Sequence, residues 1–281
     1  MMQEPTVRAI PLGPGVEVVA PAPPRTAFGR QLSIWHSLAG IVVLLLVIPF
    51  LFRMEWRNFA PFLNPLIWRN AIALGIMVTV GAAVAAIVVS LPLATGFALA
   101  RLSGFWWIRL PAVLYIEGLR ALPVLILILF SFYSLPPDLP GTLQRGVVAA
   151  TIALTLYTAA VNAETLRASI LALERGQMEA ARSLALTYWQ AMQYVVVPQA
   201  FRNALPPLIA QFTTLLKDTS LGSIVGMVEL LSRGKCIFQT YRNPVETLYI
   251  IAVLYFVLNF GLELVSLALQ KRRSLGSSLV G

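Results

Sequence analysis

Residues 164–198 read ETLRASILALERGQMEAARSLALTYWQAMQYVVVP, a long polar stretch between two apolar runs. Apolar residues recur within it at helical spacing, at Met178, Ala181, Ala185, Trp189 and Met192. Such spacing gives one apolar side to a helix that is too polar to cross a membrane, and Pro198 fits a turn at its end. The pattern predicts either an element that docks into a partner protein or a helix that lies in the membrane interface.

The composition of the whole chain indicates a protein surrounded by lipid. Of its 281 residues, 58% are hydrophobic and 12% are charged, and this charged share is about half that of a soluble domain. A soluble α/β fold is therefore excluded. The formal net charge of +9 points to anionic lipid headgroups as partners, and we expect no nucleic acid.

Six apolar stretches approach or exceed the length of a transmembrane helix, for which about 18 residues suffice. They are residues 34–52, 71–100, 110–135, 147–168, 204–227 and 247–269. The sequence therefore predicts an all-α integral membrane protein with about six transmembrane helices.

The segments around these stretches set the predicted domain organisation. Residues 1–30 are rich in proline and small residues, which predicts a flexible tail without a core of its own. Residues 31–66 would hold an additional first helix and an external loop, residues 67–272 the main transmembrane domain, and residues 273–281 a C-terminal tail.

The basic residues predict the orientation of the chain. Lys and Arg are more numerous on the side of the two termini than on the opposite side, and Lys271, Arg272 and Arg273 form an uninterrupted cluster there. Because cytoplasmic loops carry an excess of Lys and Arg, we expect both termini in the cytoplasm of a multi-pass inner-membrane protein.

The sequence lacks the residue patterns that would indicate an enzyme. Cys236 is the one cysteine and His36 the one histidine, so the chain has neither an internal disulfide nor a metal-binding cluster of these residues. The phosphate-binding motif G-x-x-x-x-G-K-[ST] does not occur in it. We therefore expect no enzymatic activity, and any ATP must be hydrolysed by another polypeptide.

Part of the polar stretch resembles the EAA loop of ABC-importer permeases. Glu179, Ala180 and Ala181, followed by Val197 and Pro198, carry this resemblance. It implies a type I ABC importer transmembrane domain whose cytoplasmic coupling helix fits a groove of a separate ATPase. The residues implied for this coupling surface are Arg175, Gly176, Glu179, Ala180, Ala181 and Ala185.

One position of this loop departs from the family pattern. Glycine is usual in the family where this chain has Ala185. Because alanine is the best helix former, a continuous helix is an alternative here to the bend of the family.

Residues 71–270 are similar throughout to the permeases of polar amino-acid importers, as in the histidine, glutamate, glutamine and arginine systems. The matching stretches are EGLRALP at 117–123, AETLR at 163–167, RGQMEAA at 175–181, PQA at 198–200, NALPP at 203–207 and LKDTSL at 216–221. Ala121 and Leu122 depart from the family, which usually has Gly-Thr before the proline. The first predicted helix lies outside the five-span core of the family.

Charged pairs inside the predicted helices are candidates for the substrate pathway, since a charge there costs roughly 2.5–3.5 kcal/mol. Glu117 and Arg120 are three residues apart, so they either pair on one helix face or leave Arg120 to bind a substrate carboxylate. Glu164 and Arg167 have the same spacing. The resemblance places the amino-acid path near this fourth helix, so Glu164 is the leading candidate for the substrate ammonium, with a pair to Arg167 as the alternative.

Lys217 and Asp218 form the third charged pair of candidates. Adjacent residues point in different directions on a helix, which argues against their being simply each other's partner. Either they line the pathway, or they pair with other helices or a second permease to hold a gate shut.

The resemblance implies how such a chain works. It implies a complex of two permeases, identical or homologous, with a cytoplasmic ATPase dimer that binds ATP and Mg and with a periplasmic or anchored substrate-binding protein. The permease itself needs no cofactor and moves polar amino acids, with glutamate, glutamine and aspartate preferred, by alternating access. The alternative is a secondary amino-acid transporter driven by an ion gradient, but we find no convincing internal repeat of the kind such transporters often show.

Overall fold

The computed structural model describes residues 10–11, 17–18, 54–139, 144–173 and 175–277, with backbone alone at residues 10–11, 17–18, 175–176 and 265–277. The chain divides into two compact units, Met1–Met54 and Glu55–Gly281. In the first unit, strands β1 (Ile10–Pro11) and β2 (Glu17–Val18) pair antiparallel. The predicted first transmembrane helix, residues 34–52, lies outside the described residues.

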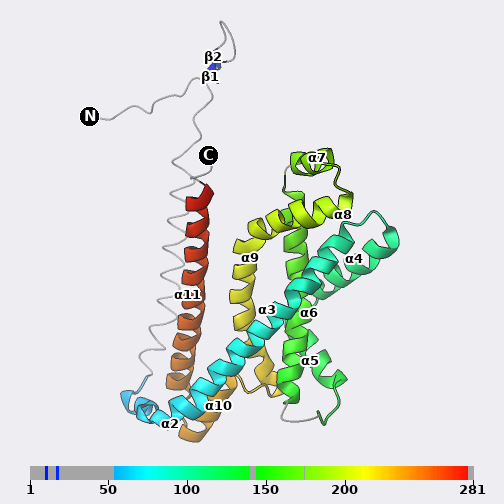
Figure 1. The fold of residues 1–281 in the computed structure, drawn as a ribbon. Helices are drawn as coiled ribbons and strands as arrows, with labels where there is room; N and C mark the ends of the chain where they lie inside the picture. The colour runs from blue at the N-terminus through cyan, green and yellow to red at the C-terminus, as the bar shows by residue number, and fades with distance from the viewer. Residues whose placement is uncertain (1–9, 12–16, 19–53, 140–143, 174, 278–281) are drawn as a thin grey trace, which may run out of the picture. The chain divides into compact units, whose positions relative to one another are not determined.

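The second unit is helical throughout its described part (Figure 1). Its elements are η1 (Trp56–Leu63), α2 (Pro65–Ile67), η2 (Trp68–Ile72), α3 (Ala73–Arg101), α4 (Trp106–Ala121), α5 (Val124–Ser134), α6 (Arg145–Leu171), α7 (Arg175–Ser183), α8 (Tyr188–Ala191), η3 (Met192–Val196), α9 (Val197–Asp218), η4 (Thr219–Val225), α10 (Leu230–Tyr241) and α11 (Pro244–Ser277). The predicted all-α class is confirmed for this unit.

Three helical segments of the described residues are long and apolar enough to cross a membrane, namely Pro65–Arg101, Arg145–Leu171 and Pro244–Leu264. They coincide with the predicted helices 71–100, 147–168 and 247–269. The helix predicted at 204–227 is displaced, because α9 begins at Val197 and gives way to η4 after Asp218. Gly226, with φ of 78°, then ends η4 in the left-handed conformation that glycine adopts freely.

The helix predicted at 110–135 is a bent pair and not one straight span. α4 ends at Ala121, α5 begins at Val124, and their axes differ by 108°. Leu122 between them is extended, with φ −90° and ψ 140°. Pro123 explains the bend, since a proline disfavours the helical conformation of the residue before it and supplies no N–H to the helix. Counted as one broken span, this pair gives a fourth candidate among the described residues.

α6 is the central helix of the bundle, and α3, α4, α5 and α9 pack against it. Small buried residues dominate these contacts, such as Ala83 on α3 and Ala153 on α6, each at most 1% exposed. Larger side chains fill the space between them, as Leu154 of α6 does against Leu215 of α9. Since lipid tails are as apolar as leucine, helices in a membrane associate by close van der Waals packing, which small residues permit.

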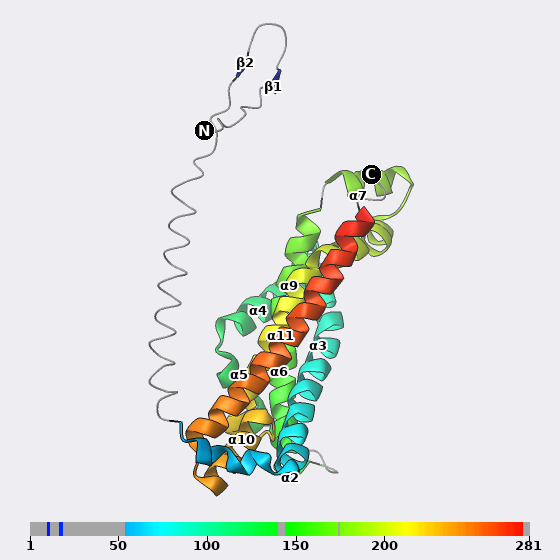
Figure 2. The same ribbon diagram turned by 90° about the vertical axis from the view of Figure 1, so that its left-hand side faces the viewer.

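The two ends of the bundle are built differently (Figures 1 and 2). α7 lies at one end, whereas α2 and α10 lie at the other, and α11 runs from the α10 end towards the α7 end. At the α10 end, the buried carboxylate of Glu229 accepts hydrogen bonds from two backbone N–H groups of α10 and from Tyr255 of α11. A Cβ at Gly146 would collide with the backbone at Val225–Met227, so only glycine allows α6 to approach this turn. Hydrogen bonds and close backbone packing therefore join α6, α10 and α11 at the α10 end.

Candidate functional site

α7 presents its polar side outward and is held to the bundle by a few contacts. Ala181 is buried, at 3% exposure, while Glu179 and Ala180 are exposed. The amide of Gln199 on α9 donates to Oε1 of Gln177 at 3.2 Å. The carboxylate of Glu179 makes no ion pair with the part of the chain that the structure describes. This leaves Glu179, Ala180 and Arg182 exposed on a short amphipathic helix.

The alternative of a continuous helix at Ala185 is wrong, because α7 ends at Ser183 and Ala185 has φ of 58°. The N–H of Leu186 donates to the carbonyl of Ala181 at 3.3 Å, and the N–H of Ala185 donates to Arg182 at 2.9 Å. These bonds close a left-handed turn of the kind that usually ends a helix with glycine. In alanine this conformation costs roughly 1–2 kcal/mol, so the surrounding structure imposes the bend against the preference of the residue.

After the turn the chain re-enters a helix at a capped start. Oγ1 of Thr187 accepts from the N–H of Gln190, and the side chain of Gln190 accepts from the N–H of Thr187 at 2.9 Å. This reciprocal capping box fixes where α8 begins. α8, η3 and α9 follow one another without a gap from Tyr188 to Asp218. The predicted helix through 178–192 is therefore two helices, and its second part leads directly into the bundle.

The residues of the apolar side predicted for 178–192 do not all face the bundle. Ala181 and Met192 are buried, at 3% and 4% exposure, whereas Trp189 is 58% exposed and Ala185 is also exposed. The turn at Ala185 rotates the later positions away from the side that α7 presents to the bundle.

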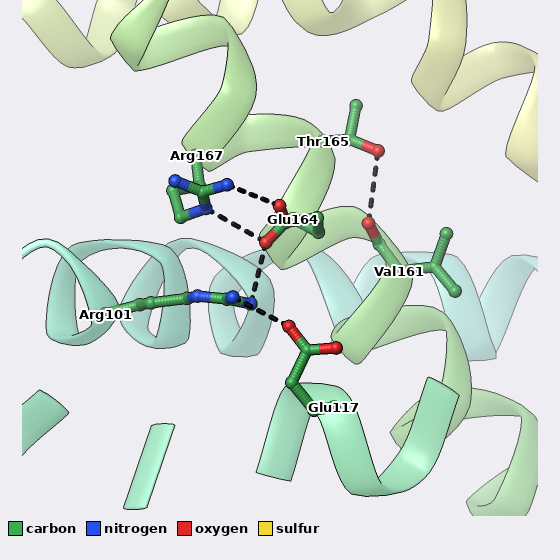
Figure 3. A network of polar contacts seen from close by, with 6 residues as sticks. All are labelled: Arg101, Glu117, Val161, Glu164, Thr165 and Arg167. Atoms are coloured by element: carbon green, nitrogen blue, oxygen red, sulfur yellow. Dashed lines mark hydrogen bonds and ion pairs between the residues drawn. The ribbon is translucent and has the colours of Figure 1, made fainter. Parts of the chain in front are cut away.

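A cluster of four charged side chains joins α3, α4 and α6 (Figure 3). Arg101, Glu117, Glu164 and Arg167 form this ion-pair cluster. Arg101 Nη1 lies 2.8 Å from Glu164 Oε2, and Arg101 Nη2 lies 2.7 Å from Glu117 Oε1. Arg167 holds both oxygens of Glu164, at 2.6 and 3.0 Å. Such charge-assisted contacts are strong and directional, so the cluster fixes the three helices to one another.

The pairing within the cluster differs in part from the sequence prediction. Glu164 and Arg167 pair, as one of the alternatives for them held. The pair between Glu117 and Arg120 does not form, because Glu117 bonds to Arg101 while the Arg120 side chain is exposed. Arg101 was not predicted as a member, since it looked like an ordinary basic residue at the end of an apolar helix. Arg101 is the last residue of α3, and no local pattern in the sequence indicates its two partners.

The remaining predicted pathway residues make no ion pair with this cluster of described residues: Lys217 and Asp218 lie on α9, and Arg120 lies on α4, three residues after Glu117. Lys217 is exposed and Asp218 half-buried at the end of α9. Within the described residues, neither side chain forms an ion pair, and the same holds for Arg120. Of Arg175 and Gly176 the structure describes the backbone alone. In that part no group of three or more His, Cys, Asp or Glu residues is arranged to hold a metal ion.

Comparison with known proteins places this arrangement in a family. The chain is 31% identical over 229 residues to the glutamate transport system permease protein GluD of Corynebacterium glutamicum, covering 80% of this chain and 82% of that protein. It is 37% identical over 171 residues to a probable glutamine ABC transporter permease, GlnP, of Bacillus subtilis, covering 59% of this chain and 76% of the relative.

A solved structure agrees with these relatives. An amino acid ABC transporter crystallised with histidines has a chain that is 28% identical, with a TM-score of 0.67, over 78% of this chain and 99% of that one. The family model described as the binding-protein-dependent transport system inner membrane component matches residues 90–275. This match covers the ion-pair cluster, α7 and the helices between them, and the chain belongs to the family of inner membrane components of binding-protein-dependent transport systems.

Proposed function

We propose that this chain is the permease subunit of an ABC importer that carries polar amino acids, with glutamate, glutamine and aspartate preferred. The family match and the named relatives support this function. They do not favour the alternative of a secondary transporter driven by an ion gradient. On this proposal the chain is not an enzyme, and a partner ATPase dimer binds ATP and Mg.

α7 is the observation that carries the proposed mechanism. Its exposed Ala180 allows a partner to approach closely, and a basic residue of the ATPase would form a charge-assisted contact with the exposed carboxylate of Glu179. Buried Ala181 and the turn at the exposed Ala185 would position this surface against the partner. Arg175 and Gly176 would complete the docking surface at the start of the helix. Because α8 and α9 follow in one run, a movement of α7 reaches α9 and the helices packed on it.

The proposed assembly has further members. A second permease, identical or homologous, completes the pathway, and a periplasmic or anchored binding protein delivers the substrate at the α10 end. The chain would lie in the bacterial inner membrane in contact with lipid, with the α7 end and both termini in the cytoplasm. Residues 1–30, 31–66, 67–272 and 273–281 would be the tail, the additional helix with its loop, the transmembrane domain and the C-terminal tail.

For the substrate path we propose two roles among the charged residues. Both oxygens of Glu164 are bonded to arginines, so a substrate ammonium would have to replace Arg101 or Arg167 there. This favours a gate at Glu164 that opens during the cycle. Arg120, Lys217 and Asp218 make no ion pairs within the described residues and remain the candidates for charged groups of the substrate or of the second permease.

The test is uptake of labelled glutamate, glutamine and aspartate by proteoliposomes that contain the permeases, the ATPase and the binding protein. We expect Glu179→Arg to abolish ATPase binding and uptake while the subunit still assembles in the membrane. Glu55→Arg is the matched control, since it reverses an exposed charge of the other end of the bundle and should leave ATPase binding unchanged. Uptake that persists without the ATPase would overturn the importer assignment in favour of a secondary transporter.

A further inference from the structure

Six buried side-chain atoms of the described residues have no hydrogen-bond partner. They are Arg145 Nε, Thr158 Oγ1, Asn162 Nδ2, Asn162 Oδ1, Arg233 Nε and Asn259 Oδ1. Half of them thus belong to Thr158 and Asn162, which lie four residues apart on one face of α6. Both residues are 0% exposed.

This pair differs from Arg145 and Asn259, each of which has one unpaired atom but uses another. Arg145 uses another of its N–H groups, which donates to the carbonyl of Phe132 at 2.6 Å. Asn259 also uses its amide, which donates to the carbonyl of Tyr255 at 2.7 Å. In Thr158 and Asn162, the whole hydroxyl and the whole carboxamide are unused. Buried polar groups are nearly always hydrogen-bonded. Two neighbouring side chains on the central helix without any hydrogen bond to the described residues therefore need an explanation.

Apolar clusters flank the pair on α6, one helical turn before Thr158 and one turn after Asn162. One turn before Thr158, Leu154 packs in a cluster with Ala83 and Ala86 of α3 and Leu215 of α9. One turn after Asn162, Leu166 packs in another cluster with α3 and α9 residues. The pair therefore lies between two apolar layers where α6 meets α3 and α9. It is also distinct from the ion-pair cluster, because Asn162 and Glu164 are two residues apart and point to different faces of the helix.

A transport cycle supplies the explanation, because helices that separate in another state of the cycle expose what they bury in this one. A carboxamide both donates and accepts hydrogen bonds, and a hydroxyl does the same. These groups match the carboxylate, which accepts, and the ammonium, which donates, that all α-amino acids share. Neither Thr158 nor Asn162 carries a charge, so they can serve substrates of any side-chain charge.

We propose that Thr158 and Asn162 form a binding site for the α-carboxylate and α-ammonium groups of the transported amino acid, exposed when α3 or α9 separates from α6. This site rests on the proposed importer function and adds to it the contact that recognises the amino-acid backbone.

The test compares three variants in the reconstituted complex. Asn162→Leu and Thr158→Val each remove an unpaired polar group and keep the approximate shape of the side chain. Thr155→Val is the matched control on the same helix, because the Thr155 hydroxyl is already satisfied by the carbonyl of Thr151 at 2.7 Å. The readouts are the Tm of the purified complex and the uptake kinetics of labelled glutamate, glutamine and aspartate.

We expect Asn162→Leu and Thr158→Val to keep or raise the Tm, since replacing an unsatisfied buried polar group by an apolar one removes a cost. Uptake measured as kcat/KM should fall by about tenfold for Asn162→Leu, the loss of one hydrogen bond to a charged group. The loss should be similar for all three substrates, because the site reads the groups they share. Thr155→Val should leave uptake unchanged.

Two results would overturn the proposal. Unchanged uptake in both variants would show that the pair is only a packing defect. A lower Tm, with uptake reduced only in proportion to the complex that survives, would show that the pair holds a structural water. If Asn162→Leu does not assemble, Thr158→Val decides by the same criteria. A wild-type complex that moves no amino acid would instead contradict the proposed function itself.

Discussion

Arg101 and Glu164 connect the last residue of α3 to the central helix through a contact of 2.8 Å. The same guanidinium reaches Glu117 of α4 with its other nitrogen, at 2.7 Å. The three helices are thus held by one side chain on the side of the bundle where the chain passes into α7. A single substitution can therefore test the whole cluster.

Arg101→Met should destabilise the protein by about 1–3 kcal/mol. The carboxylates of Glu117 and Glu164 would each lose the hydrogen bond that the charged guanidinium donates to them. The side chains of Arg101 and Glu164 are 18% and 23% exposed, so solvent screens this contact only in part. The measurement is the Tm of the purified complex. Arg120→Met is the control, since that exposed arginine forms no ion pair within the described residues and should change stability by at most about 0.5 kcal/mol. Equal effects of the two variants would show that the cluster contributes nothing specific.

Ala185→Gly should stabilise the turn after α7 by about 1 kcal/mol, because glycine adopts a φ of 58° without the steric cost that alanine bears. In a helix interior the same exchange has the opposite sign. Ala168→Gly in the last turns of α6 should accordingly destabilise by about 0.5–1 kcal/mol. Hydrogen exchange of the α7 and α6 amides measures both effects. A destabilising Ala185→Gly would mean that the left-handed turn does not persist in solution.

Thr187→Ala should loosen the start of α8 by about 1 kcal/mol, since it removes the side chain that caps the N–H of Gln190. Thr187→Ser keeps the hydroxyl and should behave as wild type. Faster hydrogen exchange at Gln190 and Ala191 in the alanine variant, with normal exchange in the serine variant, would establish the capping role. If coupling passes through α8, the alanine variant should also lower substrate-stimulated ATP hydrolysis by the partner, which a coupled assay measures.

The orientation of the chain can be tested with its own cysteine. Cys236 is the one cysteine of the sequence and is exposed on α10. A membrane-impermeant maleimide should label it in right-side-out vesicles, and Cys236→Ser should abolish the signal. In that cysteine-free background, Ala180→Cys on α7 should be labelled only in inside-out vesicles from which the ATPase has been stripped. Labelling of both positions from one side would contradict the proposed topology.

Features that depend on local periodicity were predictable from the sequence, and those that depend on packing between helices were not. α6 and the polar segment around Glu179 follow from hydrophobic runs and turn residues, and both appear where they were expected. Even the bend before Val124 had a local signal in Pro123, although the apolar run around it concealed this. Arg101 and Asn162 had no such signal, because the importance of each arises only from what α3, α4, α6 and α9 bring next to it.

The break between α4 and α5 also restricts what can surround this chain at that point. At about 1.5 Å per residue, helices of 16 and 11 residues are each too short for a hydrocarbon layer of about 30 Å. Helix ends leave carbonyl and amide groups without intrahelical partners, and lipid tails cannot supply any. The backbone around Leu122 and Pro123 must therefore face water or another protein surface, and acyl chains cannot be its immediate neighbours.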